Sequence, residues 1–200
     1  MRKSCKITLL TRGEEETFLV GASLGRWVRP GDVVGLVGDL GSGKTCLTKG
    51  IASGLGVPES CCVRSPTFVI LNTYPGRCTL HHMDLYRVRD PLELEDLGWR
   101  EILYGDGVCV VEWADKMLEL LPETHIRVVL SHQGEENRRI VLEVLGDLDG
   151  ERWEDLKRSL APFGGQDSGS ASWEGAGVDR GLTARNEHLE QDLLGLPRKE

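Results

Sequence analysis

The chain of 200 residues carries a formal net charge of −8, from 24 basic and 32 acidic residues, and 40% of its residues are hydrophobic. This length and composition predict one compact domain with a sizeable core and argue against two domains of equal size. The acidic balance argues against a protein that grips nucleic acid through a broad basic surface of its own.

The region before residue 38 predicts a strand, a helix and a second strand. Alternating apolar residues around Ile7 and Leu9 are typical of a short strand. Three glutamates at 14–16 favour the start of a helix, because acidic side chains interact well with its N-terminal end. The residues Arg-Pro-Gly-Asp at 29–32 end this helix, and the apolar run 33–37 predicts a buried strand.

A glycine-rich segment follows that strand directly. Residues 38–45, Gly-Asp-Leu-Gly-Ser-Gly-Lys-Thr, fit the pattern G-x-x-x-x-G-K-[ST] at every fixed position. Its backbone N–H groups are expected to cradle a polyphosphate, while Lys44 neutralises the terminal phosphates and Thr45 offers a hydroxyl to Mg²⁺. A ligand-free glycine turn is the alternative, which the complete match disfavours. We therefore predict a nucleotide site formed by Asp39, Leu40, Gly41, Ser42, Gly43, Lys44 and Thr45.

Beyond this loop the sequence predicts further helices and strands. Gly56 and Pro58 end the helix that follows the loop, and Pro75-Gly76 is typical of a hairpin turn. The apolar run 108–111 is typical of a parallel strand that is covered on both faces. The expected elements are a helix to residue 55, strands over 68–74 and 79–84, a largely helical segment over 91–104, strands over 108–111, 124–131 and 138–145, and an amphipathic helix over 152–160.

Together these elements predict an α/β fold of the P-loop NTPase type. We expect a central, mostly parallel sheet with antiparallel additions and helices on both faces, in which the last two strands extend one edge. The P-loop domain should occupy residues 1–150 and a C-terminal helix residues 151–163. The composition from Gly164 onward, rich in glycine and serine, predicts a flexible linker and tail over 164–200.

Two carboxylates, Asp84 and Glu112, end predicted strands. Open α/β sheets bind ligands at the carboxyl ends of their strands, and hydrolysis of a nucleotide needs an acid near the metal and a group that orders the attacking water. We therefore predict metal-binding or catalytic roles for both residues, beside Lys44. The alternatives are an aspartate that caps the next element and a glutamate that begins a helix.

Two further pairs of polar residues could belong to a functional site, but their patterns are less specific. Ser65 and Thr67 flank a proline in a loop where a switch could sense the terminal phosphate, although Ser-Pro-Thr is equally an ordinary turn. His81 and His82 are adjacent in a predicted strand, where neighbouring side chains face opposite ways. We expect one histidine in the core and one at the surface, and assign no metal to them.

The cysteines and the apolar runs indicate the cellular compartment in which the protein is expected. The six cysteines show neither a C-x-x-C pair nor the Cys/His spacing of a zinc site, so we interpret them as reduced thiols. The apolar run 7–10 is too short for a secretory signal, and no stretch is long enough for a membrane helix. We therefore expect a cytoplasmic protein without a membrane partner. The cysteines are Cys5, Cys46, Cys61, Cys62, Cys78 and Cys109.

Four motifs, in this order and spacing, resemble those of the bacterial TsaE family, formerly YjeE. They are the loop at 38–45, Val-Arg-Ser-Pro-Thr-Phe at 63–68, His-Met-Asp-Leu-Tyr-Arg at 82–87 and Val-Glu-Trp-Ala-Asp at 111–115. The resemblance covers roughly residues 8–146 and implies an ATPase that uses Mg²⁺. It also implies a role in making threonylcarbamoyladenosine on tRNAs that read codons beginning with A, together with the TsaB–TsaD heteromer, which would contact the tRNA.

The resemblance implies roles for particular residues. Lys44 should contact the terminal phosphates, Thr45 and Glu112 should hold Mg²⁺, and Asp84 should lie just beyond the metal ligands or aid the water. Trp113 should lie beside the site.

The resemblance also implies, less specifically, that Thr17 and Arg138 contact the nucleotide.

Two departures from the family pattern stand out. Cys46 replaces a second threonine, and the chain continues past the usual end of the family.

Three functions remain open at this point. The first is an ATPase that is slow alone and drives a partner complex. The second is a small-molecule P-loop kinase, although no arginine-rich lid lies between Asp84 and Glu112. The third is a docking module gated by the nucleotide, in which hydrolysis is incidental. A GTPase is disfavoured, because no Asn-Lys-x-Asp segment occurs.

Overall fold

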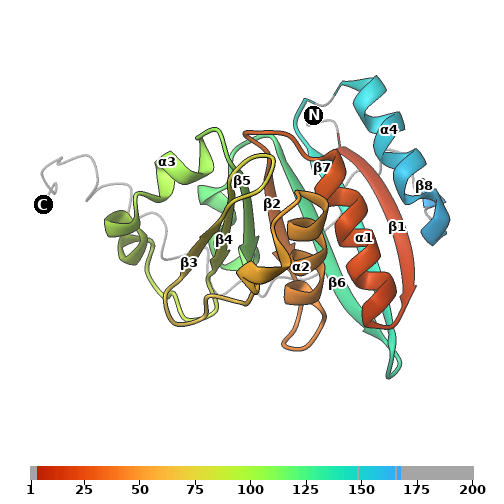
Figure 1. The fold of residues 1–200 in the computed structure, drawn as a ribbon, viewed down its shortest axis with the longest axis horizontal. Coiled ribbons are helices and arrows are strands. Elements are labelled where there is room, and N and C mark those ends of the chain that lie inside the picture. The colour runs from red at the N-terminus through yellow and green to blue at the C-terminus, as the bar shows by residue number, and fades with distance from the viewer. Residues whose placement is uncertain (1–3, 148, 165, 168–200) are drawn as a thin grey trace, which may run out of the picture. The chain divides into compact units, whose positions relative to one another are not determined.

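The computed structural model describes residues 4–147, 149–164 and 166–167. Most of the expected linker and tail, from residue 168 onward, lies outside the described residues. The described strands form one sheet of eight, in the order β3-β4-β5-β2-β6-β7-β1-β8 (Figure 1). Their bounds are β1 Ser4–Arg12, β2 Val33–Val37, β3 Leu71–Tyr74, β4 Leu80–Asp84, β5 Val108–Glu112, β6 His125–Gln133, β7 Asn137–Leu145 and β8 Gln166–Asp167.

The centre of this sheet is parallel and its flanks are antiparallel. β2 pairs in parallel with both β5 and β6, and β4 pairs in parallel with β5. The remaining pairings are antiparallel. β2 and β5 are almost wholly buried, as their continuous apolar sequence predicts. The predicted P-loop α/β fold is thus confirmed, although β1 and β8 complete the side that β6 and β7 extend.

The first strand of the β3–β4 hairpin is shorter than predicted. The carbonyl oxygen of Pro66 accepts hydrogen bonds from the backbone N–H groups of Val69 and Ile70, at 3.1 and 2.7 Å, and this turn delays the strand until Leu71. Ile70 adopts a φ of 65°. Because this left-handed conformation costs a β-branched residue about 1–3 kcal/mol, apolar alternation alone does not foresee it. Phe68 lies in the turn and is 85% exposed.

Helices connect these strands. None of the described helices is long and apolar enough to cross a membrane. The helical segment predicted over 91–104 is divided by Gly98, whose φ is 61°. The α-helices are α1 Glu14–Trp27, α2 Lys44–Gly54, α3 Trp99–Leu103 and α4 Gly150–Leu160, and short 3₁₀ segments cover Glu59–Cys61, Pro91–Leu97, Ala114–Leu120 and Ala161–Phe163.

Two hydrophobic cores lie on the two faces of the sheet. Val108 and Val110 of β5 point into a core that α1, α2 and α4 cover. Cys109 and Val111, which alternate with them, point into a second core beneath α3 and the 3₁₀ segments on either side of β5. The prediction of helices on both faces is therefore correct.

Helices α1 and α2 approach each other through glycines. A Cβ atom built on Gly21 would lie 2.3 Å from the carbonyl oxygen of Leu47, and one on Gly50 would lie 2.1 Å from that of Phe18. Gly25 and Gly54, one turn further along each helix, are equally crowded. Because no side chain separates the two backbones here, the N-terminal turn of α1 is brought beside the start of α2, where the glycine-rich loop ends (Figure 1).

Candidate active site

The glycine-rich loop joins the end of β2 to the start of α2. Gly38, Gly41 and Gly43 have φ values of 148°, 78° and 105°, which lie outside the usual range of other residues. A Cβ atom on Gly38 would lie 2.3 Å from the carbonyl oxygen of Leu130, so the strand beside the loop requires glycine there. The backbone therefore turns tightly enough for its N–H groups to face an anion at the N-terminal end of α2.

Lys44 is held against this loop by its backbone. Its Nζ atom donates to the carbonyl oxygens of Gly38, at 2.7 Å, and Asp39, at 2.9 Å, and lies 3.8 Å from the ring centroid of Trp113. Burial lowers the pKa of Lys44, although Glu112 and other nearby carboxylates oppose that shift. Neutral carbonyl groups satisfy an ammonium group less well than charged oxygens do, so this side chain is suited to bind phosphate.

Thr45 and Glu112 meet across the edge of the sheet. The Thr45 hydroxyl donates to Glu112 Oε2 at 3.0 Å. Glu112 Oε1 lies 2.9 Å from His82 Nε2 and 3.5 Å from the hydroxyl of Thr48. Glu112 is only 2% exposed, and no lysine or arginine of the described chain forms an ion pair with it. A carboxylate buried in this way favours a cation at its open side.

Asp84 ends β4 and lies beside Glu112, its register partner on the neighbouring strand β5. Its Oδ2 atom accepts hydrogen bonds from the hydroxyls of Ser65 and Thr67, the latter at 2.9 Å, and its Oδ1 atom accepts from the backbone N–H of Tyr86, also at 2.9 Å. The loop that the sequence marks as a candidate switch is thus attached to the candidate catalytic aspartate.

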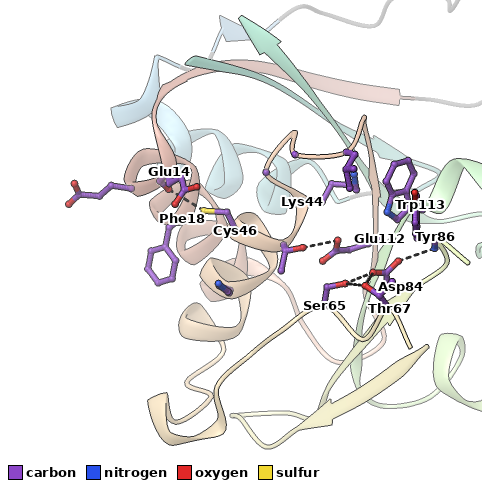
Figure 2. A pocket seen from close by; sticks show the side chains of 16 residues that line it. Glu14, Phe18, Lys44, Cys46, Ser65, Thr67, Asp84, Tyr86, Glu112 and Trp113 are labelled. Atoms are coloured by element: carbon purple, nitrogen blue, oxygen red, sulfur yellow. Dashed lines mark hydrogen bonds between the residues drawn. The ribbon is translucent and has the colours of Figure 1, made fainter. Parts of the chain in front are cut away.

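These groups line one pocket of about 850 Å³ (Figure 2). The Thr45 hydroxyl meets Glu112 within it, and Figure 2 shows Lys44 and Trp113 on the same side of Glu112. This volume suits a nucleotide-sized ligand. The predicted residues that line it are Leu40, Gly41, Gly43, Lys44, Thr45, Ser65, Thr67, Asp84, Glu112 and Trp113.

Four predicted contact residues do not line the pocket. Asp39 turns its carbonyl oxygen to Lys44, and Ser42 is buried with a hydroxyl that finds no hydrogen-bond partner within the described residues. Thr17 lies behind the loop, where its methyl group would be 3.6 Å from a Cβ atom on Gly43. Arg138 donates to backbone oxygens of its own hairpin.

Several other residues that line the pocket were not predicted. Phe18 belongs to α1, and Cys46 and Lys49 belong to α2, so the glycine contact between these helices brings them to one wall. Tyr86, two residues after Asp84, lies 5.0 Å from the Trp113 ring and closes the opposite wall. The sequence offers a signal for Tyr86, which lies in the motif around Asp84, and for Cys46, which directly follows the loop at 38–45, but none for Phe18 or Lys49. Glu14 and Glu15 also line the pocket.

The residues fit a magnesium nucleotide. The described residues contain no cluster of three or more His, Cys, Asp or Glu side chains that would hold a metal ion. Mg²⁺ is usually bound through one or two side chains together with phosphate oxygens and water, which is what Thr45 and Glu112 beside the loop would provide.

A phosphate loop between β2 and α2, with acids at the ends of two neighbouring parallel strands, defines a P-loop NTPase fold. Comparison with known proteins gives the family. The model of the family described as threonylcarbamoyl adenosine biosynthesis protein TsaE matches residues 11–140. The chain belongs to the TsaE family, as its motifs suggested.

Individual relatives agree with this membership. A protein of Bacillus subtilis named tRNA threonylcarbamoyladenosine biosynthesis protein TsaE is 44% identical over 138 residues, which cover 68% of this chain and 85% of the relative. A protein of the same name from Treponema pallidum is 41% identical over 133 residues, which cover 66% and 97%. The crystal structure of Bacillus subtilis YdiB, 35% identical, matches with a TM-score of 0.63 over 79% of this chain and 97% of YdiB.

Proposed function

We propose that this chain binds ATP with Mg²⁺, hydrolyses it, and thereby serves the biosynthesis of threonylcarbamoyladenosine on tRNA. Its family membership and P-loop fold support nucleotide binding and ATPase activity. The name that its relatives carry supports the pathway. The observation that carries the proposal is the convergence of Lys44, Thr45, Asp84 and Glu112 on one pocket.

Each residue has a chemical role in this proposal. The loop N–H groups and Lys44 bind the phosphates and stabilise the charge that develops on them during attack by water. Thr45 and Glu112 hold Mg²⁺, which neutralises phosphate charge when bound. Asp84 lies beside Glu112 and orders the attacking water once its oxygens are free of other donors.

The proposal includes slow turnover in the isolated protein. Both oxygens of Asp84 already accept hydrogen bonds, from Ser65, Thr67 and the backbone of Tyr86. Three donors leave this carboxylate only about one of its four acceptor sites for a water molecule. Turnover should therefore rise when a partner moves the loop at 65–67 away from Asp84.

We propose the TsaB–TsaD heteromer as that partner, on the strength of the family motifs. The net charge of −8 disfavours direct binding of tRNA through charge, so the tRNA would be contacted through the complex. Cytoplasmic location follows from this pathway as part of the same proposal.

The experiment is reconstitution of the full chain with TsaB and TsaD. Formation of threonylcarbamoyladenosine on tRNA is followed over many turnovers for wild type, Lys44→Ala and Glu112→Ala. The matched control is Arg158→Ala, a change on α4 at a side chain that is 75% exposed. We expect sustained modification with wild type and the control, and a stop after few turnovers with the two site variants.

The outcomes separate the functions. Modification that proceeds without this chain would refute the pathway role. Sustained modification with Glu112→Ala, despite its lost hydrolysis, would favour the docking module. A phosphorylated metabolite in place of free phosphate would identify a kinase.

A further inference from the structure

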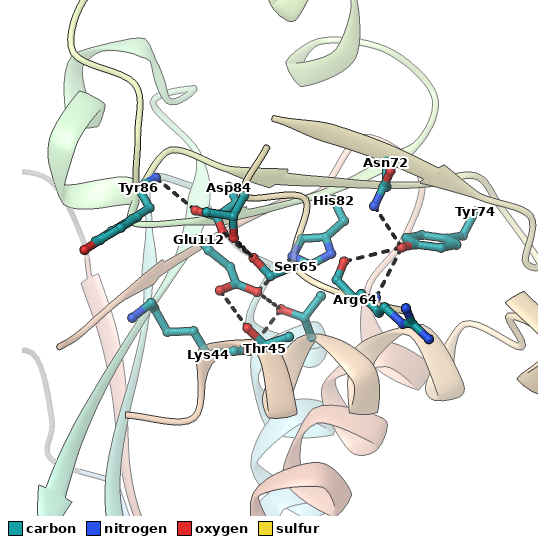
Figure 3. Close-up of polar contacts among 12 residues, drawn as sticks. Lys44, Thr45, Arg64, Ser65, Asn72, Tyr74, His82, Asp84, Tyr86 and Glu112 are labelled. Atoms are coloured by element: carbon teal, nitrogen blue, oxygen red, sulfur yellow. Dashed lines mark hydrogen bonds and ion pairs between the residues drawn. The ribbon is translucent and has the colours of Figure 1, made fainter. Parts of the chain in front are cut away.

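His82 is a fully buried histidine whose side chain lies close to the candidate metal ligand. It occupies the middle of β4 and has no exposed surface. Its Nε2 atom lies 2.9 Å from Glu112 Oε1 (Figure 3). Because residues two apart on a strand share a face, His82 and Asp84 point to the same side of the sheet as Glu112.

The two oxygens of Glu112 have different surroundings. Oε2 accepts a hydrogen bond from the hydroxyl of Thr45, another residue that lines the pocket, at 3.0 Å (Figure 3). Oε1 faces the interior, where His82 is its close partner and the Thr48 hydroxyl lies further away, at 3.5 Å. His82 therefore fixes one oxygen while the other is presented to Thr45.

The bond defines what His82 must supply. An ionised carboxylate only accepts hydrogen bonds, so Nε2 carries the hydrogen and donates it. The other ring nitrogen, Nδ1, has no hydrogen-bond partner among the described residues. A buried polar ring with one nitrogen unpaired is costly in a hydrophobic core, whereas an apolar side chain would fill the same space without that cost. The donated hydrogen bond is thus the feature that distinguishes histidine from an apolar residue at this position.

We propose that His82 is a positioning residue: its Nε2–H holds Glu112 Oε1 so that Oε2, together with Thr45, is oriented toward Mg²⁺. This inference rests on the proposed magnesium nucleotide site. Groups that orient a metal-binding carboxylate raise metal affinity because they restrict the side chain to the productive conformation. His82 does not touch the nucleotide in this proposal and acts through Glu112 alone.

The substitutions His82→Gln and His82→Asn both supply a side-chain N–H donor, but they place it at different distances from the backbone. The amide nitrogen of His82→Gln stands as many bonds from the backbone as Nε2 does, so it can donate to Glu112. The amide nitrogen of His82→Asn stands as many bonds from the backbone as Nδ1 does, so it is too short to donate to Glu112. The matched control is His81→Asn, since His81 lies on the opposite face of β4 and contacts the hydroxyl of Thr73 instead.

The measurement is the dissociation constant of the non-hydrolysable analogue AMP-PNP, determined by titration calorimetry at one pH, with excess Mg²⁺ and with EDTA. The constant in EDTA divided by the constant in Mg²⁺ reports how far the metal tightens binding. We expect His82→Asn to lower this ratio by about tenfold or more while the constant in EDTA changes less than about twofold. His82→Gln should keep the ratio within about fivefold of wild type, and His81→Asn should leave it unchanged.

The outcomes are distinct. A folded His82→Asn variant with the wild-type ratio overturns the inference, as does a folded His82→Gln variant that loses more than about fivefold. If His82→Asn does not fold, His82→Gln alone decides by that criterion. If wild type itself binds no tighter with Mg²⁺, the proposed magnesium site fails, and this failure is visible before any variant is compared.

Discussion

Thr45 Oγ1 lies 3.0 Å from Glu112 Oε2, although 67 residues separate the two in sequence. The contact arises because β2 and β5 are neighbouring parallel strands, with Leu36 opposite Glu112 in their register. A phosphate loop that leaves one strand and an acid that ends the next are thereby placed at the same edge of the sheet. The residues proposed to bind the nucleotide and those proposed to hold the metal therefore meet at one edge of one sheet.

We expect Glu112→Gln to separate nucleotide binding from hydrolysis. Glutamine keeps the size of the side chain and removes its charge, so hydrolysis should fall by about 100-fold or more while binding of ATP in EDTA changes by less than about threefold. Phosphate release and titration calorimetry measure the two effects. Glu95→Gln, at an exposed carboxylate paired with Arg100, is the control. Near wild-type, Mg²⁺-dependent hydrolysis by Glu112→Gln would contradict the assigned role.

Thr67→Val should loosen the loop at 65–67 in the nucleotide-free protein. Valine has nearly the same shape but cannot donate to Asp84 Oδ2, where the Thr67 hydroxyl lies at 2.9 Å. Since hydrogen bonds to charged groups are stronger than neutral ones and this loop is partly exposed, the free energy of unfolding should fall by about 1–2 kcal/mol. Urea denaturation measures that loss, and hydrogen exchange should locate it in the loop.

The control for this loop is Thr73→Val. Thr73 is also a threonine of this region, but it is exposed on β3 and its hydroxyl contacts only His81 among the described residues. It should lose less than about 0.5 kcal/mol, as surface substitutions usually do. Equal losses for the two variants would show that the bond to Asp84 does not hold the loop.

Much of the site was predictable because it depends on backbone geometry. The spacing of glycines and lysine in 38–45 specifies a loop conformation. A continuous apolar run predicts a buried strand, and the residue at which the run ends predicts the end of that strand. Glu112 follows such a run and Asp84 ends the predicted strand at 79–84, so their proximity could be predicted from the parallel sheet. The alternation of a strand likewise predicted that one of His81 and His82 would be buried, and His82 is.

Other features depend on contacts between distant segments. The bond from His82 to Glu112 joins residues 30 apart, and adjacent histidines in a strand do not show which of them is buried. Thr17 lies behind the loop because of how deeply α1 packs against α2. The sequence of α1 alone does not predict this packing depth. The turn at Phe68 and Ile70 depends on a strained conformation that the tertiary structure enforces.

Gly50→Ala tests the close approach of α1 and α2. Alanine is the better helix former by about 1 kcal/mol, so an isolated helix would gain stability. In the folded protein the new methyl group would lie 2.1 Å from the carbonyl oxygen of Phe18, and the helices would have to separate. We expect a net loss of about 1–2 kcal/mol in urea denaturation, because overpacking, with the backbone shifts that it forces, typically costs 1–3 kcal/mol and occasionally more.

The matched control is Gly150→Ala at the start of α4, where a Cβ atom would meet nothing within 4 Å. This variant should be neutral or more stable by about 0.4–1 kcal/mol. If Gly50→Ala behaved in the same way, the backbone contact between α1 and α2 would not be what sets their distance.

Cys46 offers a test of nucleotide occupancy that does not depend on turnover. Its thiol lines the pocket and donates to the carbonyl oxygen of Glu14 at 3.2 Å. Burial, and then the nearby Glu14, raise the pKa of Cys46 above its ordinary value of 9.0. Because the thiolate is the reactive form, alkylation by iodoacetamide should be slow at neutral pH and should still accelerate as the pH passes 9.

Bound AMP-PNP should slow alkylation of Cys46 several-fold, and mass spectrometry of the labelled peptides measures this protection. Cys62 is exposed and does not line the pocket, so its labelling should be indifferent to nucleotide. Cys109 is fully buried, which raises its pKa to about 12, and it should react only when the protein unfolds. Labelling of Cys46 at the same rate with and without AMP-PNP, while calorimetry shows binding, would place the nucleotide away from the wall that Cys46 forms.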